Sequence, residues 1–216
     1  MSVSEIIILG TYGLMLVELI FLPVPSEAST YQLLFSRQIQ EPRLSGALLQ
    51  AHRMPIGHKL WVFLLPTSLT VIAFFLPLLQ IFFPQLKGSL LAIPFFENSL
   101  FRGLAIALII VGSLITLISV LEMRSGMKKH ALKQTWPQLQ VEGVFCWSRN
   151  PGLVGNYGWF LGLFFYFPSW VMALGFGIYL FNMHRRVLLE ESQLAARFGE
   201  TYRAYQRRVP RYLGFG

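Results

Sequence analysis

The stretch that determines the fold is the apolar run at residues 152–183, GLVGNYGWFLGLFFYFPSWVMALGFGIYLFNM. It is about 32 residues long, whereas one membrane-spanning helix needs only about 20. Pro168 and Ser169 stand near its middle, where a proline interrupts a helix. We therefore expect two helices of about 15 residues, each about 22 Å long, that form a tight hairpin entering and leaving on the same side of a membrane.

Three further apolar runs precede this hairpin, at about 5–23, 60–83 and 100–121. Each is close to the length that crosses a bilayer. Gly103 and Gly112 in the third run are small residues of the kind that let membrane helices pack closely. Together with the hairpin, these runs predict an all-α, polytopic membrane protein with about five transmembrane helices.

The composition indicates the same class of protein. Hydrophobic residues make up 54% of the 216 residues, charged residues only 13%, and the mean hydropathy is +0.54. Soluble domains carry about 25% charged residues. A soluble fold of this size has too little interior for so much apolar surface, so a bilayer is the simpler solvent.

Several function classes are disfavoured by the polar residues. Cys146 is the single cysteine and the four histidines are scattered, which predicts neither an internal disulfide nor a metal site. The net charge is +8, but the basic residues lie between and after the apolar runs. This placement favours membrane lipids over nucleic acid as the partner.

The basic residues also predict the orientation in the membrane. Most of the 18 Lys and Arg residues fall in three segments, at 24–59, 122–151 and 184–216. The positive-inside rule places such segments in the cytosol. We expect the N-terminus outside and the C-terminus in the cytosol, in either a bacterial inner membrane or the endoplasmic reticulum.

The tail is expected to form an amphipathic helix from about 184 to 207. Its apolar residues recur at helical spacing and share one face; they are Leu194, Phe198, Tyr202 and Tyr205. Val209 and Pro210 end the pattern. This helix would be a separate cytosolic element that follows the hairpin.

The first polar cluster, Arg149-Asn150-Pro151, stands directly before the hairpin. A residue before proline avoids helical backbone, so we expect a helix to begin at Pro151. The start of a helix presents unpaired N–H groups that bind anions, and Arg149 adds positive charge there. The alternative is a basic anchor at the membrane surface followed by an ordinary helix start.

The second polar cluster, Arg185-Arg186 and Glu190-Glu191, joins the hairpin to the tail. Arg186 and Glu190 are four residues apart and can pair on one helix face. Glu191 shares the face of Leu194 and is therefore expected to point inward, where a carboxylate needs a partner. The alternative for Arg186 and Glu190 is an ordinary surface ion pair.

These clusters belong to two segments, residues 143–155 (GVFCWSRNPGLVG) and 184–213, that resemble the isoprenylcysteine carboxyl methyltransferase family and its phospholipid methyltransferase relatives. The resemblance covers about 75 C-terminal residues. Asn150 stands where the family has histidine. The most specific part of the resemblance comprises Glu190-Glu191, Phe198-Gly199, Tyr202, Tyr205 and Val209-Pro210-Arg211.

The resemblance implies a cytosol-facing pocket for S-adenosylmethionine, built by residues 141–216, while residues 1–140 provide the acceptor side. The residues that it implies around the cofactor are Arg149, Asn150, Pro151, Leu153, Glu191, Tyr202 and Tyr205. It implies that Arg186 and Glu190 are catalytic and stand beside the methyl acceptor. That acceptor would be lipophilic or small: a prenylcysteine carboxylate, a phospholipid amine or a thiol. The interpretation requires the two clusters to converge around one nucleotide-sized hollow.

Two alternatives stay open at this point. An NADPH-dependent sterol-type reductase has a similar C-terminal hairpin, and Gly155 with Asn156 faintly matches its pattern. A non-catalytic relative of the methyltransferases is the other, because Asn150 replaces the histidine of the family.

Overall fold

The computed structural model describes residues 1–21, 45–89, 91–132 and 139–214. These residues are helical apart from loops and an isolated β-bridge between Ala92 and Ser169, so the prediction of an all-α fold is confirmed for them. In chain order the α-helices are α1 (Val3–Phe21), α3 (Gly46–Arg53), α4 (Ile56–Lys59), α5 (Leu65–Phe82), α6 (Ser99–Leu132), α7 (Pro151–Tyr166), α8 (Trp170–Phe198) and α9 (Glu200–Arg208). A π-helical segment, Leu60–Leu64, joins α4 to α5.

Among the described residues, two stretches of helix are long and apolar enough to cross a membrane, Ile56–Phe82 and Ser99–Gly126. They confirm the second and third of the predicted apolar runs. A shorter apolar helix at Val3–Val17 lies within the first predicted run. The total of about five crossings is not settled by these helices and stays a prediction.

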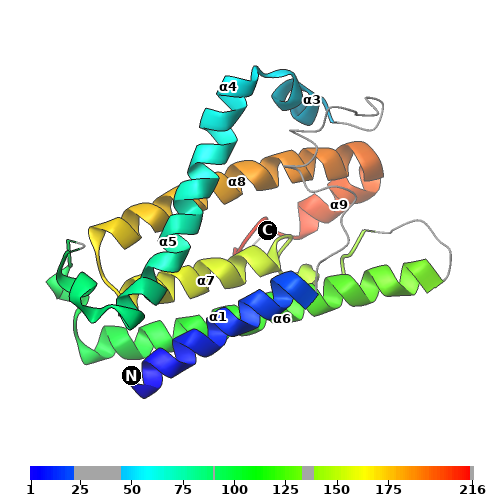
Figure 1. Cartoon of the computed structure of the whole chain (residues 1–216). Helices are drawn as coiled ribbons and strands as arrows, with labels where there is room; N and C mark the ends of the chain where they lie inside the picture. The colour runs from blue at the N-terminus through cyan, green and yellow to red at the C-terminus, as the bar shows by residue number, and fades with distance from the viewer. Residues whose placement is uncertain (22–44, 90, 133–138, 215–216) are drawn as a thin grey trace.

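The predicted hairpin is present and breaks where Pro168 and Ser169 interrupt the apolar run. The first arm, α7, is 16 residues long, close to the expected 15, whereas the second, α8, is 29 residues long and the expectation for it was wrong. Ser169 Oγ caps the start of α8 by accepting a hydrogen bond from the Met172 N–H at 3.2 Å. The two arms run back along each other (Figure 1). Their contact is aromatic, since Phe160 stacks on Phe176 and Tyr179 with ring centroids 5.6 and 5.2 Å apart.

The tail differs from its prediction. Helix α8 continues for 29 residues, from Trp170 to Phe198, so there is no separate helix from 184 to 207. The break comes at Gly199, whose φ of +54° lies in the left-handed region that favours glycine. No proline or glycine stands between residues 184 and 198, so nothing ends the helix earlier. The short helix α9 then ends before Val209 and Pro210, as expected.

Helices α6 and α7 pack with their backbones in close approach. A Cβ on Gly112 would lie 2.5 Å from the Gly155 carbonyl oxygen, and one on Gly155 would lie 2.4 Å from Thr116 Oγ1. Only glycine permits this distance. The expected packing role of Gly112 is confirmed, but that of Gly103 is wrong, because open space surrounds the Cβ position there.

The core lies where α1 and α5 meet this α6–α7 pair. Trp159 of α7 is 1% exposed and donates its indole N–H to Thr11 Oγ1 of α1 at 3.0 Å. The Tyr12 hydroxyl donates to the Phe74 carbonyl of α5 at 2.6 Å. These bonds satisfy polar groups in an apolar interior. As a result, the middle of α7 is anchored to α1, which is itself bonded to α5.

Candidate functional site

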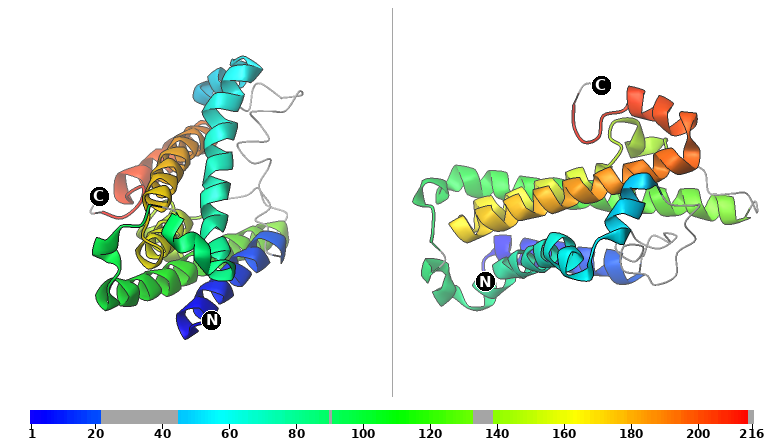
Figure 2. Two further views of the ribbon diagram at one scale, coloured as in Figure 1. Left: turned by 60° about the vertical axis from the view of Figure 1, so that its left-hand side comes forward. Right: turned by 90° about the horizontal axis from the view of Figure 1, so that it is seen from above.

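The start of α7 lies against the segment that follows α9 (Figures 1 and 2). The backbone N–H of Arg149 donates to the Pro210 carbonyl at 2.9 Å. The side-chain amide of Asn150 donates to the Arg211 carbonyl at 3.0 Å. Ser148, which is fully buried, also directs its hydroxyl at that carbonyl, at 3.4 Å. Two segments some sixty residues apart in sequence are thus tied together.

Glu191 of α8 is the buried centre of this site. It is 6% exposed and pairs with two arginines, Arg149 Nη2 at 3.2 Å and Arg211 Nη2 at 2.8 Å. Arg211 Nε also lies 3.1 Å from each carboxylate oxygen. The expectation that Glu191 points inward toward a partner is confirmed. A carboxylate held this way is stable only while its cationic partners remain.

Arg211 is a site residue that the sequence interpretation missed. It was recognised only as part of Val209-Pro210-Arg211, with no function attached. Its hydrogen bonds to Glu191 raise the pKa of the Arg211 guanidinium above its ordinary value. An inward Glu191 needs a positive partner, and Arg211 in that motif is a positive residue nearby in sequence. These two facts together could have indicated the pair.

Arg149 keeps one donor unused. Its side chain is 10% exposed, and its Nε is buried without a hydrogen-bond partner among the residues that the structure describes. Buried N–H groups in native proteins are nearly always paired, and an unpaired one costs free energy. The Arg149 Nε is therefore a hydrogen-bond donor that an acceptor atom, such as a carboxylate oxygen, would satisfy.

The residues that open α7 are where the sequence predicted them. The helix begins at Pro151, which is fully buried, and Asn150 precedes it without capping through its side chain. However, not all of the backbone N–H groups in the first turn of α7 are free to bind an anion. Those of Leu153 and Val154 both donate to the Asn150 carbonyl at 3.1 Å. The expected anion site at this helix start is thus weaker than the bare sequence indicates.

The Arg186–Glu190 pair is also confirmed. Arg186 Nε lies 2.7 Å from Glu190 Oε1, and the side chains are 39% and 35% exposed. Neighbouring residues on a helix point about 100° apart, so Glu190 and Glu191 face different surroundings. Glu191 is buried against arginines, whereas Glu190 and Arg186 remain half-exposed on the surface beside it.

Tyr202 and Tyr205 lie on the inner side of α9. They are 1% and 4% exposed and pack with Val209, Leu194 and Phe198. The Tyr205 hydroxyl donates to the Phe145 carbonyl at 2.7 Å, and burial raises the pKa of Tyr205 to about 12. These contacts fasten α9 to the loop before α7.

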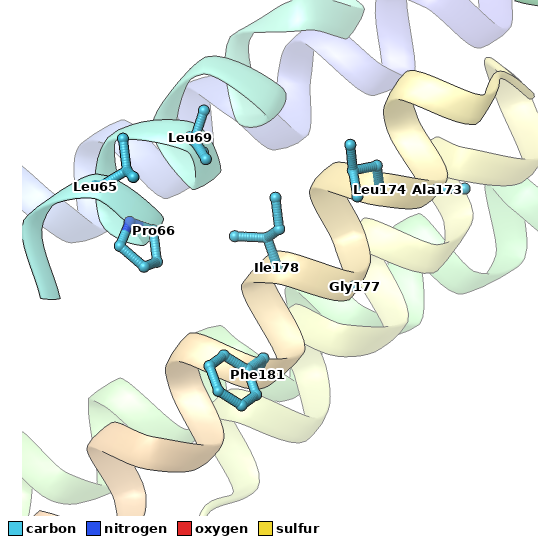
Figure 3. Close-up of a pocket in the computed structure, with 8 residues that line it drawn as sticks. All are labelled: Leu65, Pro66, Leu69, Ala173, Leu174, Gly177, Ile178 and Phe181. Atoms are coloured by element: carbon cyan, nitrogen blue, oxygen red, sulfur yellow. The ribbon is translucent and has the colours of Figure 1, made fainter. Parts of the chain in front are cut away.

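Two cavities formed by the described residues lie away from this cluster. An apolar one of about 410 Å³ opens between α5 and α8 (Figure 3). Another, of about 390 Å³, opens at the far end of the helices. Neither of these two is lined by a residue predicted for the cofactor or the acceptor. The clusters converge as expected, but a hollow does not separate Arg149 from Glu191, because their opposite charges pair directly.

Comparison with known proteins agrees with the resemblance in the sequence. Residues 100–201, from the start of α6 to the beginning of α9, match the model of the phospholipid methyltransferase family. A stretch of 73 residues is 32% identical to protein-S-isoprenylcysteine O-methyltransferase of Schizosaccharomyces pombe, covering 33% of this chain and 31% of that enzyme. Residues 100–201 are therefore a domain of the phospholipid methyltransferase family, a family of S-adenosylmethionine-dependent enzymes, distantly homologous to isoprenylcysteine O-methyltransferase.

Proposed function

We propose that this chain is an integral membrane methyltransferase that uses S-adenosylmethionine. Its acceptor is a lipophilic or small molecule: a prenylcysteine carboxylate, a phospholipid amine or a thiol. The observation that carries the proposal is the buried cluster of Arg149, Glu191 and Arg211, in which the Arg149 Nε lacks a partner among the described residues. It lies where the family domain adjoins the C-terminal segment.

The donor set fits the cofactor. The Arg149 Nε–H can hold a carboxylate oxygen, and the Glu191 carboxylate can hold an ammonium group. Bound S-adenosylmethionine supplies a sulfonium methyl group, which transfers in line to a nucleophile. The chain's own residues bind and orient, and positioning of this kind accounts for much of the rate of such reactions. The wall of this site comprises Asn150, Pro151, Leu153, Tyr202 and Tyr205.

Arg186 and Glu190 would act on the acceptor. They are half-exposed and stand on α8 directly before Glu191. The Arg186 guanidinium can hold an acceptor carboxylate, and the Glu190 carboxylate can hold an amine or accept a proton. The apolar cavity between α5 and α8 would admit the hydrocarbon part of the acceptor. It extends to Phe181, whose ring lies 5.6 Å from the Arg185 guanidinium, next to Arg186.

The same proposal includes the topology. We place residues 141–216 on the cofactor side and residues 1–140 on the acceptor side, with about five crossings, the N-terminus outside and the C-terminus in the cytosol. The two apolar spans and the basic segments support this arrangement. The host membrane is a bacterial inner membrane or the endoplasmic reticulum.

Cofactor binding is tested by calorimetry on the whole protein in detergent, with S-adenosylhomocysteine as the probe. Arg149→Lys keeps the charge but removes the Nε donor, and we expect at least about tenfold weaker binding. Arg203→Lys, at an exposed arginine of α9, is the matched control and should bind normally. No heat of binding to folded wild-type protein would contradict the proposal.

Transfer is tested with tritiated S-adenosylmethionine and a panel of lipid and thiol acceptors. Glu190→Gln should lose turnover yet still bind S-adenosylhomocysteine, whereas Glu200→Gln, on the exposed side of α9, should keep both. Absence of transfer to every acceptor would favour the non-catalytic relative. Oxidation of NADPH in the presence of a sterol would favour the reductase instead.

A further inference from the structure

The loop that leads to Arg149 is tied to a carboxylate of α6. The loop contains one short 3-10 turn, Gly143–Cys146, and ends where α7 begins at Pro151. Glu122 of α6 accepts a hydrogen bond from the Val144 N–H through its Oε2, at 2.8 Å. The two bonded residues are 22 apart in sequence. The position of the turn therefore depends on a side chain that lies well outside the loop.

Gly143 allows the Glu122 carboxylate to come close to the turn. The φ of Gly143 is +63°, in the left-handed region that favours glycine. A Cβ built on Gly143 would overlap the Glu122 carboxylate, whose three atoms are the nearest ones to that position. Both the backbone conformation and the space therefore favour glycine here, and the turn is shaped around the carboxylate.

The same turn is also bonded to α9. Phe145 is 6% exposed, and its carbonyl accepts the hydrogen bond from the Tyr205 hydroxyl at 2.7 Å. Two helices thus hold the turn, α6 through Glu122 and α9 through Tyr205. Arg149 follows four residues after Phe145, so a displaced turn would displace the arginine as well.

Arg149 requires a defined position for its proposed contact. Its side chain is 10% exposed and lies 3.2 Å from Glu191, and its Nε has no hydrogen-bond partner within the described part of the chain. A donor binds an acceptor atom well only at about 2.7–3.2 Å. If the loop samples several positions, the apparent Kd of a ligand rises as the fraction of correctly placed molecules falls. Holding the loop therefore raises affinity without any contact to the ligand.

Glu122 is placed to fix the loop more than to stabilise the fold. Helix α6 extends from Ser99 to Leu132, so Glu122 neither begins nor ends it. The Glu122 side chain is only partly buried, and the main core lies around Trp159, which bonds to α1. Loss of the carboxylate should therefore loosen the loop and leave this core intact.

We propose that Glu122 is a positioning residue for cofactor binding. Its carboxylate holds the turn Gly143–Cys146 so that Arg149 is presented to the carboxylate of the cofactor. Glu122 acts through Val144 and does not touch the cofactor. The inference rests on the proposed function, and it adds α6 to the elements that determine the geometry of the site.

The test is calorimetry on the whole protein in detergent, with S-adenosylhomocysteine as the probe. Glu122→Ala should weaken binding at least about tenfold, because the loop would be correctly placed in about a tenth of the molecules. Glu122→Gln keeps an oxygen that can accept from the Val144 N–H and should bind within about twofold of the wild type. Glu142→Ala, at an exposed glutamate of the same loop, is the matched control and should bind normally.

The possible results separate this inference from the proposed function. Wild-type affinity in Glu122→Ala would overturn the positioning role while leaving the proposed function in place. A loss in Glu122→Gln as large as that in Glu122→Ala would overturn the hydrogen bond to Val144 as the means of positioning. Absence of binding to the wild type itself would overturn both proposals.

Hydrogen exchange without a ligand distinguishes positioning from a general loss of structure. In Glu122→Ala the amides of residues 143–149 should exchange at least about tenfold faster, while those of α7 around Trp159 keep wild-type rates. The KM for the methyl acceptor should stay within about twofold of the wild type. Faster exchange throughout α6 and α7, or an acceptor KM raised as much as the Kd of S-adenosylhomocysteine, would overturn the inference.

Discussion

The α6–α7 pair and the α5–α8 pair pack in different ways. In the first, glycines bring the backbones together along much of the contact, at Gly112, Gly155 and Gly162. In the second, α5 runs steeply across α8 (Figures 1 and 2), and the close contact is local, at Ala73 and Gly175. Away from this crossing the two helices leave the apolar cavity of Figure 3.

Under the proposed function, this difference separates the binding of the cofactor from the access of the acceptor. The α6–α7 pair lies within the family domain apart from Ser99, and its close packing fixes the position of α7, which begins at Pro151. Helix α5 lies outside that domain, and its loose contact with α8 leaves room for a hydrocarbon chain. In the proposed function, the closely packed pair would hold the cofactor site in place, and the loosely packed pair would admit the acceptor.

The largest expected effect comes from Glu191, because it ties α8 to Arg149, two residues before the start of α7. Glu191→Gln leaves Arg149 buried without its counter-charge, which should lower the free energy of unfolding by about 3–5 kcal/mol. Chemical denaturation in detergent, followed by circular dichroism, measures this. The neighbouring variant Glu190→Gln is the control: its half-exposed ion pair should matter by less than about 1 kcal/mol. Equal effects of the two variants would contradict the difference in burial.

Next in size is a test of the close-packed pair itself. Gly112→Ala places a methyl group against the backbone of α7, and we expect a loss of about 2–3 kcal/mol in the same denaturation measurement. Gly103→Ala, on the same helix but in open space, should be neutral or stabilising by up to about 1 kcal/mol. If both variants unfold alike, the helices do not approach as closely as described.

The α5–α8 pair should tolerate added side-chain volume in its cavity. Gly177→Leu adds a side chain where the structure has open space, so the midpoint of unfolding should barely change. If the cavity admits the acceptor, the KM for a lipophilic acceptor should rise about tenfold, or about 1.4 kcal/mol in binding, while cofactor affinity stays constant. Gly13→Leu, in open space on α1, is the control for added apolar bulk. An unchanged KM would remove the cavity from the acceptor's route.

The smallest effect is expected at α9. Tyr205→Phe removes the hydrogen bond to the Phe145 carbonyl and should cost about 1 kcal/mol. The pKa of Tyr205 in the folded protein is raised to about 12, whereas in the unfolded chain it is near 10. The stabilisation by the protonated hydroxyl is therefore complete below pH 10 and is lost as the pH rises toward 12. Unfolding measured from pH 9 to 12 should show a steeper decline for the wild type than for Tyr205→Phe. Parallel curves would contradict the assignment.

The parts of the molecule that follow from local sequence were predictable. Pro168 marks the hairpin because a proline interrupts a helix wherever it stands, and Glu191 was expected inside because it shares a face with Leu194. Both arguments need only a few neighbouring residues. The end of α8 was predicted less well, since the pattern of apolar residues continues across Gly199 without showing the change in backbone direction.

Features built by distant segments were not predictable in this way. Arg211 reaches Glu191 only because α9 turns back over α8, and the sequence carries no measure of that turn. The cavity of about 390 Å³, which Gln80 helps to line, is formed by four separate segments, and none of them indicates a cavity by itself. Arg149 and Glu191 are in direct contact because their opposite charges attract, and the hollow expected around the two clusters stays a prediction.

The bond between the Arg149 N–H and the Pro210 carbonyl has a practical consequence for handling the protein. An affinity tag fused shortly after Leu213 would pull on a segment that also positions Arg211 and the Asn150 amide. A fusion before Ser2 would instead disturb the cavity that contains Gln80. The terminus chosen for a purification tag therefore decides which of these two regions the tag can disturb.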